Sequence, residues 1–392
     1  MNVSDVVALA SPEGQALLAE LAGTAGEDPV ALAARLRRAG HDPALAALAT
    51  TQSRLRARAA VKFGTRSGEL LFTAAGAEQA TRAVVAAEHA RRFAAAGVRR
   101  VADLGCGVGA DSLAFLDAGM EVLPVDADPA TVAVASYNLG REVRCADVTA
   151  GVVDGLGPRD GAWFDPARRT SGGRRLFDPE ATSPPLSFVL DTAARIPATG
   201  AKLAPGLPHG LVPTGAEAQW TSVDGEVVEC ALWCGPLARP GMVRSARVVR
   251  GSAVHEINDV DLPVAAAGPV GEFLHEPDGA VIRSGLVARV AADLDGRLLD
   301  ETIAYVTTDS SQGSPFTRAF RVLEVLPFGL KPLRARLRAL DVGTLTVKKR
   351  GTAVDPDQFR KQLALKGSRT ATIVLTRIAG KQSVLVVEPV SP

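Results

Sequence analysis

The chain has 392 residues, of which 47% are hydrophobic, and a net charge of +1. It is long enough for two or three domains with cores of their own, and its overall charge selects no class of partner. Its four cysteines, Cys106, Cys145, Cys230 and Cys234, are too few and too scattered for a disulfide framework or a metal site. No apolar run has the length of a membrane span and the N-terminus lacks a basic signal-peptide start, so a soluble cytoplasmic protein without metal is expected.

Residues 1–75 are expected to form a helical segment. Three places share one start signal, a capping oxygen directly before a proline that can take the first helical position. They are Ser11-Pro12, Asp28-Pro29 and Asp42-Pro43. The third helix ends in basic residues that either meet phosphates or form a solvated helix face, namely Arg54, Arg56, Arg58 and Lys62. Residues 70–93 then indicate a short strand-like entry and one long helix.

The stretch Val101–Pro129 is the most informative part of the chain. It predicts a strand, a glycine-rich turn, a helix and a second strand that ends in an acid. Gly105, Gly107 and Gly109 allow the backbone to approach a ligand at places where a Cβ would collide with it. This outline is typical of the first half of a nucleotide-binding α/β sheet.

Two acids help to choose between a dinucleotide and S-adenosylmethionine (SAM) as the ligand. Asp126 stands about 20 residues beyond the glycines, where an acid can bind ribose hydroxyls of either cofactor. Asp103 comes two positions before the first glycine. A carboxylate there attracts the amino group of SAM and repels a pyrophosphate, so Asp103 favours SAM.

The segment Asp103–Gly109 resembles motif I of class I SAM-dependent methyltransferases, and Asp126–Pro129 resembles their ribose-binding motif. The resemblance implies that Asp103 and the three glycines hold the methionine part, that Asp126 binds the ribose, and that Asp147 binds the adenine. The segment 70–79 before motif I, here called the lead-in, is similar to the corresponding segment of RNA methyltransferases such as the trimethylguanosine synthase group. This similarity implies that Thr73 and Gln79 contact the methionine carboxylate. The alternatives are a plain turn aspartate at Asp147 and ordinary helix capping by Thr73.

A second motif, Asp165-Pro166-Ala167-Arg168, follows an apolar strand whose carboxyl end is where ligands bind in open α/β sheets. It resembles motif IV of amino-methyltransferases, which implies that Asp165, Pro166 and Arg168 position the methyl acceptor. Ala167 and Arg168 depart from the proline and aromatic residue of that family, which puts transfer to an amine in question. An arginine plane can stack on a base or grip a phosphate, and a surface loop with an incidental Asp-Pro turn is the alternative. This loop has no cysteine, which argues against carbon methylation of a pyrimidine.

A hairpin signal follows the fifth expected strand. Residues 218–223 and 226–233 are expected to pair across Asp224-Gly225. Methyltransferase sheets end in such a reversed hairpin strand, whereas those of dinucleotide dehydrogenases normally do not. The expected fold is therefore α/β: a Rossmann-like class I methyltransferase sheet of seven strands with a terminal antiparallel hairpin.

The last part of the chain is strongly basic. Residues 331–381 hold 13 basic and three acidic side chains, a local net charge of +10 in a chain of +1. Such a patch is an electrostatic footprint for a phosphate backbone, with a solvated helix face as the alternative. Pro-Phe-Gly-Leu-Lys (327–331) and Val-Lys-Lys-Arg-Gly (347–351) resemble the THUMP-like domain that follows a methyltransferase domain in a bacterial family. RNA docking is predicted on a basic surface that includes Lys331, Arg334, Arg338, Lys348, Lys349 and Arg350.

The domains expected are a helical segment at 1–75, a SAM-dependent methyltransferase domain at 76–240 and an α+β THUMP-like domain at 241–392. The predicted function is SAM-dependent methylation of a base in ribosomal or transfer RNA. Methylation of a small molecule or a protein stays open, as does RNA binding by a non-catalytic relative that kept the fold. An NAD-dependent oxidoreductase is a third, more distant alternative.

Overall fold

A computed structural model describes residues 1–167 and 178–390, so the predicted acceptor residue Arg168 lies outside the described residues. The chain divides into two compact units. Unit 1 comprises Met1–Leu207 and Ala231–Arg239, and unit 2 comprises Pro208–Cys230 and Pro240–Pro392. The 3₁₀ turns aside, the elements are given below, first the N-terminal helices and then each sheet with its helices.

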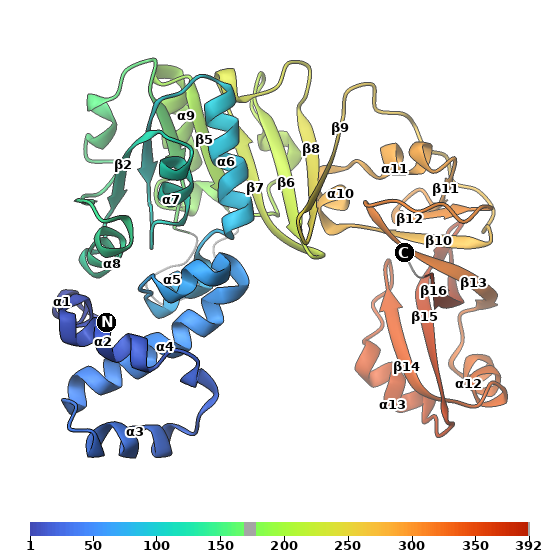
Figure 1. Cartoon of the computed structure of the whole chain (residues 1–392). Helices are drawn as coiled ribbons and strands as arrows, with labels where there is room; N and C mark the ends of the chain where they lie inside the picture. Colours follow the sequence, from blue (N-terminus) through green and yellow to red (C-terminus); the bar gives the residue numbers. More distant parts are fainter. Residues whose placement is uncertain (168–177, 391–392) are drawn as a thin grey trace. The chain divides into compact units, whose positions relative to one another are not determined.

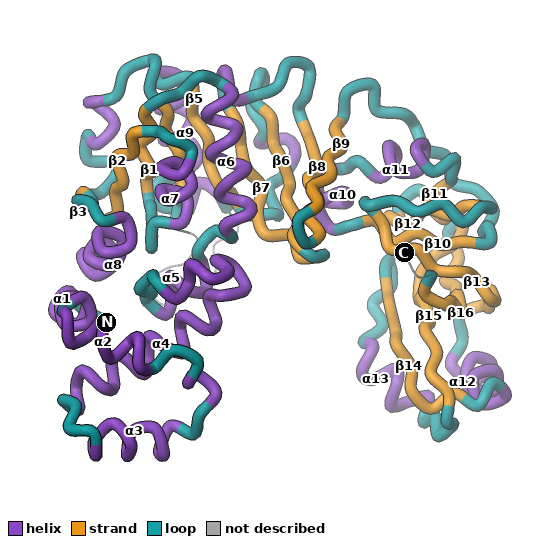
Figure 2. The backbone as a smooth tube through the Cα atoms, in the orientation of Figure 1, coloured by secondary structure: helices purple, strands orange, loops and turns teal. Residues whose placement is uncertain are grey.

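The N-terminal part of unit 1 is helical, as predicted (Figures 1 and 2). Ser11, Asp28 and Asp42 each accept a hydrogen bond from the backbone N–H of the third residue of the helix that follows, and proline takes the first position of each helix. The helices are α1 (Val3–Ala10), α2 (Pro12–Glu20), α3 (Pro29–Arg38) and α4 (Pro43–Phe63). The three expected helix starts are therefore confirmed.

The single long helix expected within residues 70–93 is wrong. The structure has two helices, α5 (Ala74–Gln79) and α6 (Ala83–Ala95), with a break between them. Lys62 donates to the carbonyls of Glu78 and Ala80, and the hydroxyl of Thr81 donates to the carboxylate of Asp111 at 2.7 Å. These tertiary partners satisfy polar groups at the break, which the local sequence pattern could not foresee.

The first sheet has the strand order β3-β2-β1-β4-β5-β7-β6-β8-β9. The pairings β1 with β2, β1 with β4, β2 with β3 and β4 with β5 are parallel. The strands are β1 (Arg100–Leu104), β2 (Glu121–Asp126), β3 (Arg144–Cys145), β4 (Gly161–Phe164), β5 (Ala198–Leu203), β6 (Glu217–Val223), β7 (Glu226–Trp233), β8 (Arg244–Arg250) and β9 (Ala253–Asn258). The helices between them are α7 (Ala110–Asp117), α8 (Pro129–Leu139) and α9 (Leu186–Arg195).

The last two strands of the seven-stranded part form the expected hairpin. Asp224 and Gly225 both have positive φ, 51° and 87°, as a tight type I′ turn requires. The second strand of the hairpin, β7, lies between β5 and β6, which is the reversed order that the resemblance implied and confirms the fold class. Two further strands were not expected here: the run 245–249, placed by the sequence in the C-terminal part, lies in β8, which pairs in parallel with β6.

Two hydrophobic clusters hold unit 1 together. One joins the N-terminal helices to the glycine-rich loop and to α7 and α8, through residues such as Leu9, Phe72, Val108 and Val134. The other lies under α6 and centres on aromatic rings, including Trp163 stacked on Trp233 with centroids 5.3 Å apart. The N-terminal helices therefore share a core with the loop that is predicted to hold the cofactor.

Unit 2 contains a second, seven-stranded sheet with the order β11-β12-β10-β13-β16-β15-β14. Its strands are β10 (Phe273–Pro277), β11 (Arg297–Asp300), β12 (Ile303–Thr308), β13 (Thr317–Pro327), β14 (Val342–Lys349), β15 (Arg369–Ile378) and β16 (Lys381–Pro389). The helices of this part are α10 (Gly279–Ser284), α11 (Val287–Asp293), α12 (Leu330–Ala339) and α13 (Pro356–Leu363).

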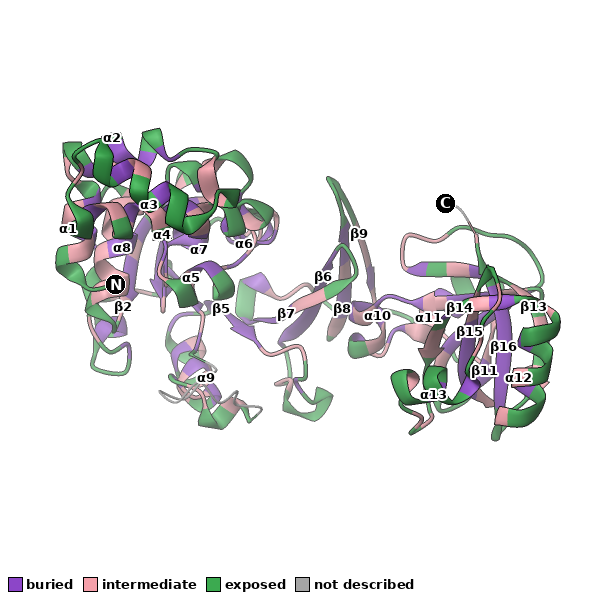
Figure 3. Ribbon diagram, turned by 90° about the horizontal axis from the view of Figure 1, so that it is seen from below, coloured by how far each residue is buried: buried purple, intermediate pink, exposed green. Residues whose placement is uncertain are grey.

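Helices α12 and α13 cover one face of this sheet. Leu337 of α12 and Phe359 of α13 pack in one cluster with Ile373 of β15 and Val384 of β16. The neighbouring residues of those strands, such as Val374, belong to a separate cluster, because side chains alternate between the two faces of a strand. Figure 3 shows the strands β15 and β16 largely buried and the outer surfaces of α12 and α13 exposed.

Candidate active site

The glycine-rich loop leaves β1 at Leu104 and enters α7 at Ala110. Gly105 has φ +92°, and a Cβ added there would lie 2.7 Å from the carbonyl oxygen of Asp165. Gly107 has φ +56°, yet a Cβ added there would meet nothing within 4 Å. The first glycine is therefore required by the close approach of the loop after β4, whereas a side chain at the second would meet no neighbouring atom.

Asp103 is 1% exposed at the end of β1. Ser112 donates to its Oδ2 at 2.5 Å, but its Oδ1 is buried without a hydrogen-bond partner among the described residues. Burial, and then the charge of Asp111, raise the pKa of Asp103 well above its usual range. A buried acceptor without a donor is costly, and a ligand ammonium group would supply that donor, so this residue fits SAM.

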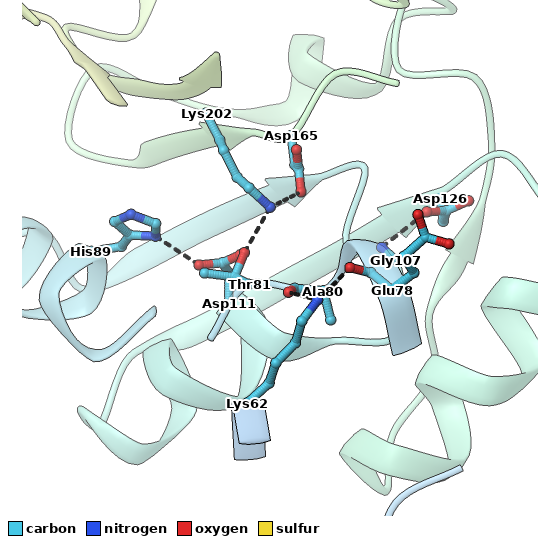
Figure 4. A network of polar contacts seen from close by, with 10 residues as sticks. All are labelled: Lys62, Glu78, Ala80, Thr81, His89, Gly107, Asp111, Asp126, Asp165 and Lys202. Carbon is cyan, nitrogen blue, oxygen red and sulfur yellow. Dashed lines mark hydrogen bonds and ion pairs between the residues drawn. The ribbon is translucent and has the colours of Figure 1, made fainter. Parts of the chain in front are cut away.

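Asp126, at the end of β2, is held in one orientation by two backbone donors. Gly107 N–H donates to its Oδ2 at 3.0 Å (Figure 4), and Asp128 N–H donates to its Oδ1 at 3.0 Å. Burial raises the pKa of Asp126. Each carboxylate oxygen keeps a second lone pair, so the residue can still accept from the two hydroxyls of a ribose.

Asp147 lies in the loop after β3, beside Asp126, because Ala146 N–H donates to the carbonyl of Asp126 at 3.0 Å. Its Oδ1 accepts from Thr149 N–H at 2.8 Å and from the Thr149 hydroxyl at 2.7 Å. The backbone hydrogen bond from Thr149 lowers the pKa of Asp147. Asp147 therefore makes the contacts expected of an ordinary turn aspartate, and its binding of adenine stays a prediction.

Thr73 and Gln79 lie at the two ends of α5. Thr73 Oγ1 accepts from Gly76 N–H at 2.9 Å, which is the capping contact, and Gln79 is exposed. Helix α5 rests against the glycine-rich loop, because a Cβ at Gly76 would lie 2.3 Å from Cγ1 of Val108. Contact of Thr73 and Gln79 with the cofactor carboxylate stays a prediction.

Asn138 of α8 ties this lead-in to the glycine-rich loop, and the sequence did not single it out. Its Oδ1 accepts from Leu71 N–H at 2.7 Å, and its Nδ2 donates to the carbonyls of Leu71 and Val108, each at 2.9 Å. One amide thus positions segments 37 residues apart in the sequence. An asparagine within a helix carries no local signal of such a role.

Asp165 follows β4 and faces the glycine-rich loop. Its N–H donates to the carbonyl of Leu104 at 3.1 Å, and Lys202 Nζ donates to its Oδ2 at 2.8 Å. The Lys202 side chain is 5% exposed and that of Asp165 is 26% exposed. Pro166 is buried, and Ala167 forms an antiparallel bridge with Ser183.

Lys202 also belongs to a chain of hydrogen-bonded polar side chains inside unit 1 (Figure 4). Its Nζ donates to Thr81 Oγ1 at 2.9 Å, Thr81 donates to Asp111 Oδ2, and Asp111 Oδ1 lies 2.7 Å from His89 Nδ1. Burial works against ionisation of Asp111, but the hydrogen bond from His89 leaves the pKa of Asp111 below its usual value. The sequence analysis missed these residues, although a lysine within the apolar run of β5 was a usable signal, because a buried charge needs partners.

The six predicted RNA-contact residues are partly used inside unit 2. Lys348 Nζ lies 2.6 Å from Glu276 Oε2, Lys349 Nζ donates to the carbonyl of Val354 at 2.8 Å, and the Arg350 guanidinium lies 5.0 Å from the centroid of the Tyr305 ring. Arg334 and Arg338 of α12 donate to carbonyls at the end of α13, those of Gln362 and Ala364. Lys331 is exposed.

Within the described ranges, no group of three or more His, Cys, Asp or Glu side chains could hold a metal ion. The same ranges contain no helix that is long and apolar enough to span a membrane.

Comparison with known proteins agrees with this geometry. Residues 317–389 match the family described as THUMP domain-like, and residues 2–59 match a domain of unknown function. A candidate methyltransferase from Porphyromonas gingivalis W83, solved by crystallography, superposes with a TM-score of 0.70 at 19% identity, over 90% of this chain and 92% of that chain. At that identity the likeness shows the fold.

Two curated relatives from Mycobacterium tuberculosis, strains CDC 1551 and H37Rv, are each named as an uncharacterized S-adenosylmethionine-dependent methyltransferase. Each is 36% identical over 333 residues, which cover 83% of this chain and 90% of the relative. This excludes the NAD-dependent alternative and assigns the cofactor. The chain belongs to the family of S-adenosylmethionine-dependent methyltransferases.

Proposed function

We propose that this methyltransferase transfers the methyl group of SAM to a base in RNA. One observation carries the proposal: the match to THUMP domain-like sequences, residues 317–389, overlaps the segment 331–381 with its net charge of +10. A segment with so high a net positive charge attracts phosphates, and nucleic-acid-binding proteins gain much of their affinity from contacts between basic side chains and phosphates.

Each residue around the glycine-rich loop binds a different part of the cofactor. Asp103 Oδ1 accepts from the ammonium group, Asp126 accepts from the ribose hydroxyls, and Asp147 accepts from the adenine amino group. Gly107 leaves the space that the methionine part fills. Bound SAM supplies an activated methyl group, so these residues contribute orientation rather than activation.

The acceptor side centres on Asp165. Its backbone lies against the glycine-rich loop, within 2.7 Å of where a Gly105 Cβ would stand, so an acceptor bound to Asp165 is next to the cofactor. Lys202 occupies Oδ2 of Asp165 and leaves Oδ1 to accept an N–H of the base. Asp165 then orients the nitrogen and takes its proton as the new bond forms, and Pro166 keeps the turn rigid.

The test is mass spectrometry of nucleosides from ribosomal and transfer RNA of a strain that lacks the gene. One methylated nucleoside is expected to disappear and to return with the wild-type gene but not with Asp165→Ala. Asp154→Ala is a matched control, because that carboxylate is exposed in the same unit and pairs with Arg195 on the surface. Unchanged nucleoside profiles in every RNA fraction would contradict the proposal.

A small molecule or a protein is the second candidate acceptor. It is favoured by the contacts of Lys348, Arg334 and Arg338, whose charged groups are partly engaged within unit 2. Binding of total RNA as a function of salt separates the two candidates. A protein with six to ten phosphate contacts loses roughly a thousandfold or more in affinity between about 50 and 200 mM salt. No binding even at low salt would favour the small-molecule or protein acceptor.

A further inference from the structure

The two motifs that carry the THUMP-like resemblance meet at one end of the second sheet. Phe328 directly follows β13, and Gly351 follows β14. Phe328 N–H donates to the carbonyl of Gln382 at 3.3 Å, and Gln382 Nε2 donates to the carbonyl of Gly351 at 3.1 Å. Two segments that are 23 residues apart in the sequence are thus joined through Gln382, the second residue of β16. Neither motif alone shows this juxtaposition.

Phe328 presents an aromatic ring at this place. The residue is 39% exposed, and it is the one aromatic among the exposed large hydrophobic residues of the described chain. Its ring stacks on that of Phe359, with an angle of 16° between the planes and 6.1 Å between the centroids. Phe359 is 5% exposed and belongs to the core beneath α12 and α13. The buried ring therefore fixes the plane of the exposed one.

Basic residues lie close to Phe328 in the sequence, at the end of β14 and at the start of β16. Lys331 stands in the first turn of α12, three residues after Phe328, and Lys381 precedes Gln382; both are exposed. Lys349 and Arg350 precede Gly351. The acids of α13 are engaged locally, since Asp355 caps the helix by accepting from Gln358 N–H at 2.8 Å and Asp357 pairs with Arg360.

We infer that Phe328 is a stacking platform for an unpaired RNA base, and that Lys331 and Lys381 bind the phosphates on either side of it. The inference rests on the proposed RNA substrate and names the part of the RNA that this surface reads. A planar ring held from behind loses little freedom when a base stacks on it, and flanking ammonium groups suit a flexible backbone. Bases within a duplex are already stacked and cannot reach the ring, so single-stranded RNA is preferred.

The test uses the full chain and fluorescence anisotropy with a short fluorescent single-stranded RNA of mixed sequence, alone and annealed to its complement. Phe328→Ala is expected to weaken single-strand binding by roughly 5- to 100-fold, the effect of losing one stacked base, without changing its salt dependence. Lys331→Ala and Lys381→Ala are each expected to reduce the slope of log affinity against log salt by about 0.7. The duplex is expected to bind more weakly than the single strand.

Three control variants separate the loss of stacking from a loss of folding. Phe328→Tyr retains a flat ring and is expected to bind like the wild type, whereas Phe328→Leu retains apolar packing on Phe359 and is expected to bind like Phe328→Ala. Leu323→Ala removes another exposed apolar side chain of β13, 55% exposed, and is expected to bind normally. Equal binding by Phe328→Ala and wild type would overturn the stacking site while leaving the RNA proposal intact. No binding by the wild type at low salt would overturn both.

Discussion

Lys202 and Asp165 form a partly buried ion pair, with 2.8 Å between the ammonium nitrogen and the carboxylate oxygen, although 37 residues separate them. The pair exists because β4 and β5 are adjacent parallel strands. Their carboxyl ends meet at one edge of the sheet, which is where such sheets bind ligands. The ammonium group fixes one carboxylate oxygen, so the other is presented in a defined direction.

The first prediction concerns the acceptor side. Asp165→Asn is expected to lower the rate of methyl transfer by roughly 10²- to 10⁴-fold, because an amide cannot take the proton of the acceptor. The affinity for S-adenosylhomocysteine should change little, since Asp165 is assigned to the acceptor rather than to the cofactor. Initial rates with radiolabelled SAM and RNA from a strain lacking the gene, together with calorimetry, measure both quantities. A large loss of cofactor affinity would contradict the assignment.

The second prediction concerns the ion pair itself. Lys202→Met leaves Asp165 without its charged partner and is expected to lower the free energy of unfolding by about 3 kcal/mol, the lower end for a broken buried pair, because Asp165 is partly exposed. Urea unfolding measures this. In the double variant with Asp165→Asn the loss should be smaller than the sum of the single losses by about 0.5–3 kcal/mol. Strict additivity would show that the two groups do not interact.

The third prediction compares two glycines of one loop. Gly105→Ala is expected to destabilise the fold strongly, because its Cβ would lie 2.7 Å from the Asp165 carbonyl at a φ of +92°. Gly107→Ala adds a methyl group with nothing within 4 Å, so the cost is about 1–2 kcal/mol for the left-handed backbone. The second variant should fold and yet lose S-adenosylhomocysteine binding in calorimetry. Normal binding by Gly107→Ala would show that the cofactor does not fill this space.

The fourth prediction concerns pH. Burial and the charge of Asp111 raise the pKa of Asp103, so the folded protein favours the protonated form of this acid. The contribution of Asp103 to the stability of the fold therefore increases as the pH falls through the raised pKa. Asp103→Asn mimics the protonated form, and the protein without ligand should melt at the same temperature as wild type or higher. Its affinity for S-adenosylhomocysteine should fall by roughly 10- to 100-fold, because the charged acceptor for the ammonium group is lost.

The same residue predicts a proton linkage. Wild-type binding should tighten as pH rises and release protons, since an ammonium group needs Asp103 ionised. Calorimetry in two buffers of different ionisation enthalpy measures the release, which should disappear in Asp103→Asn. If the release persisted in that variant, the titrating group would be Asp126, whose pKa burial also raises.

The fifth prediction concerns Asn138. Asn138→Ala removes the partner of Leu71 N–H and of two carbonyls, so we expect a loss of about 2–3 kcal/mol in stability and weaker cofactor binding, because the lead-in and the loop separate. Asn138→Asp keeps the acceptor for Leu71 N–H and loses both donors, so its defect should be of similar size. Thermal unfolding with and without S-adenosylhomocysteine measures both effects. A stable Asn138→Ala with normal ligand-induced stabilisation would contradict this role.

Much of the chain up to the hairpin of β6 and β7 was accessible from local sequence, because the signals are local. A capping oxygen before a proline fixes where a helix begins, as at Asp42, and an aspartate and a glycine with positive φ fix the hairpin turn at Asp224-Gly225. Asp103 and the glycines after it are contiguous, so the loop and its preference for a cationic ligand could be read without a structure.

Tertiary structure decided what depends on contacts between distant segments. The break between α5 and α6 follows from partners on α4, α7 and β5, the pairing of Lys202 with Asp165 follows from strand order, and the meeting of Phe328 with Gly351 follows from the register of β16. A helix or strand signal extends over a few neighbouring residues, whereas these contacts are set by how whole elements pack. The sequence by itself therefore determined the elements and the cofactor loop, and the packing of those elements decided which side chains complete the site.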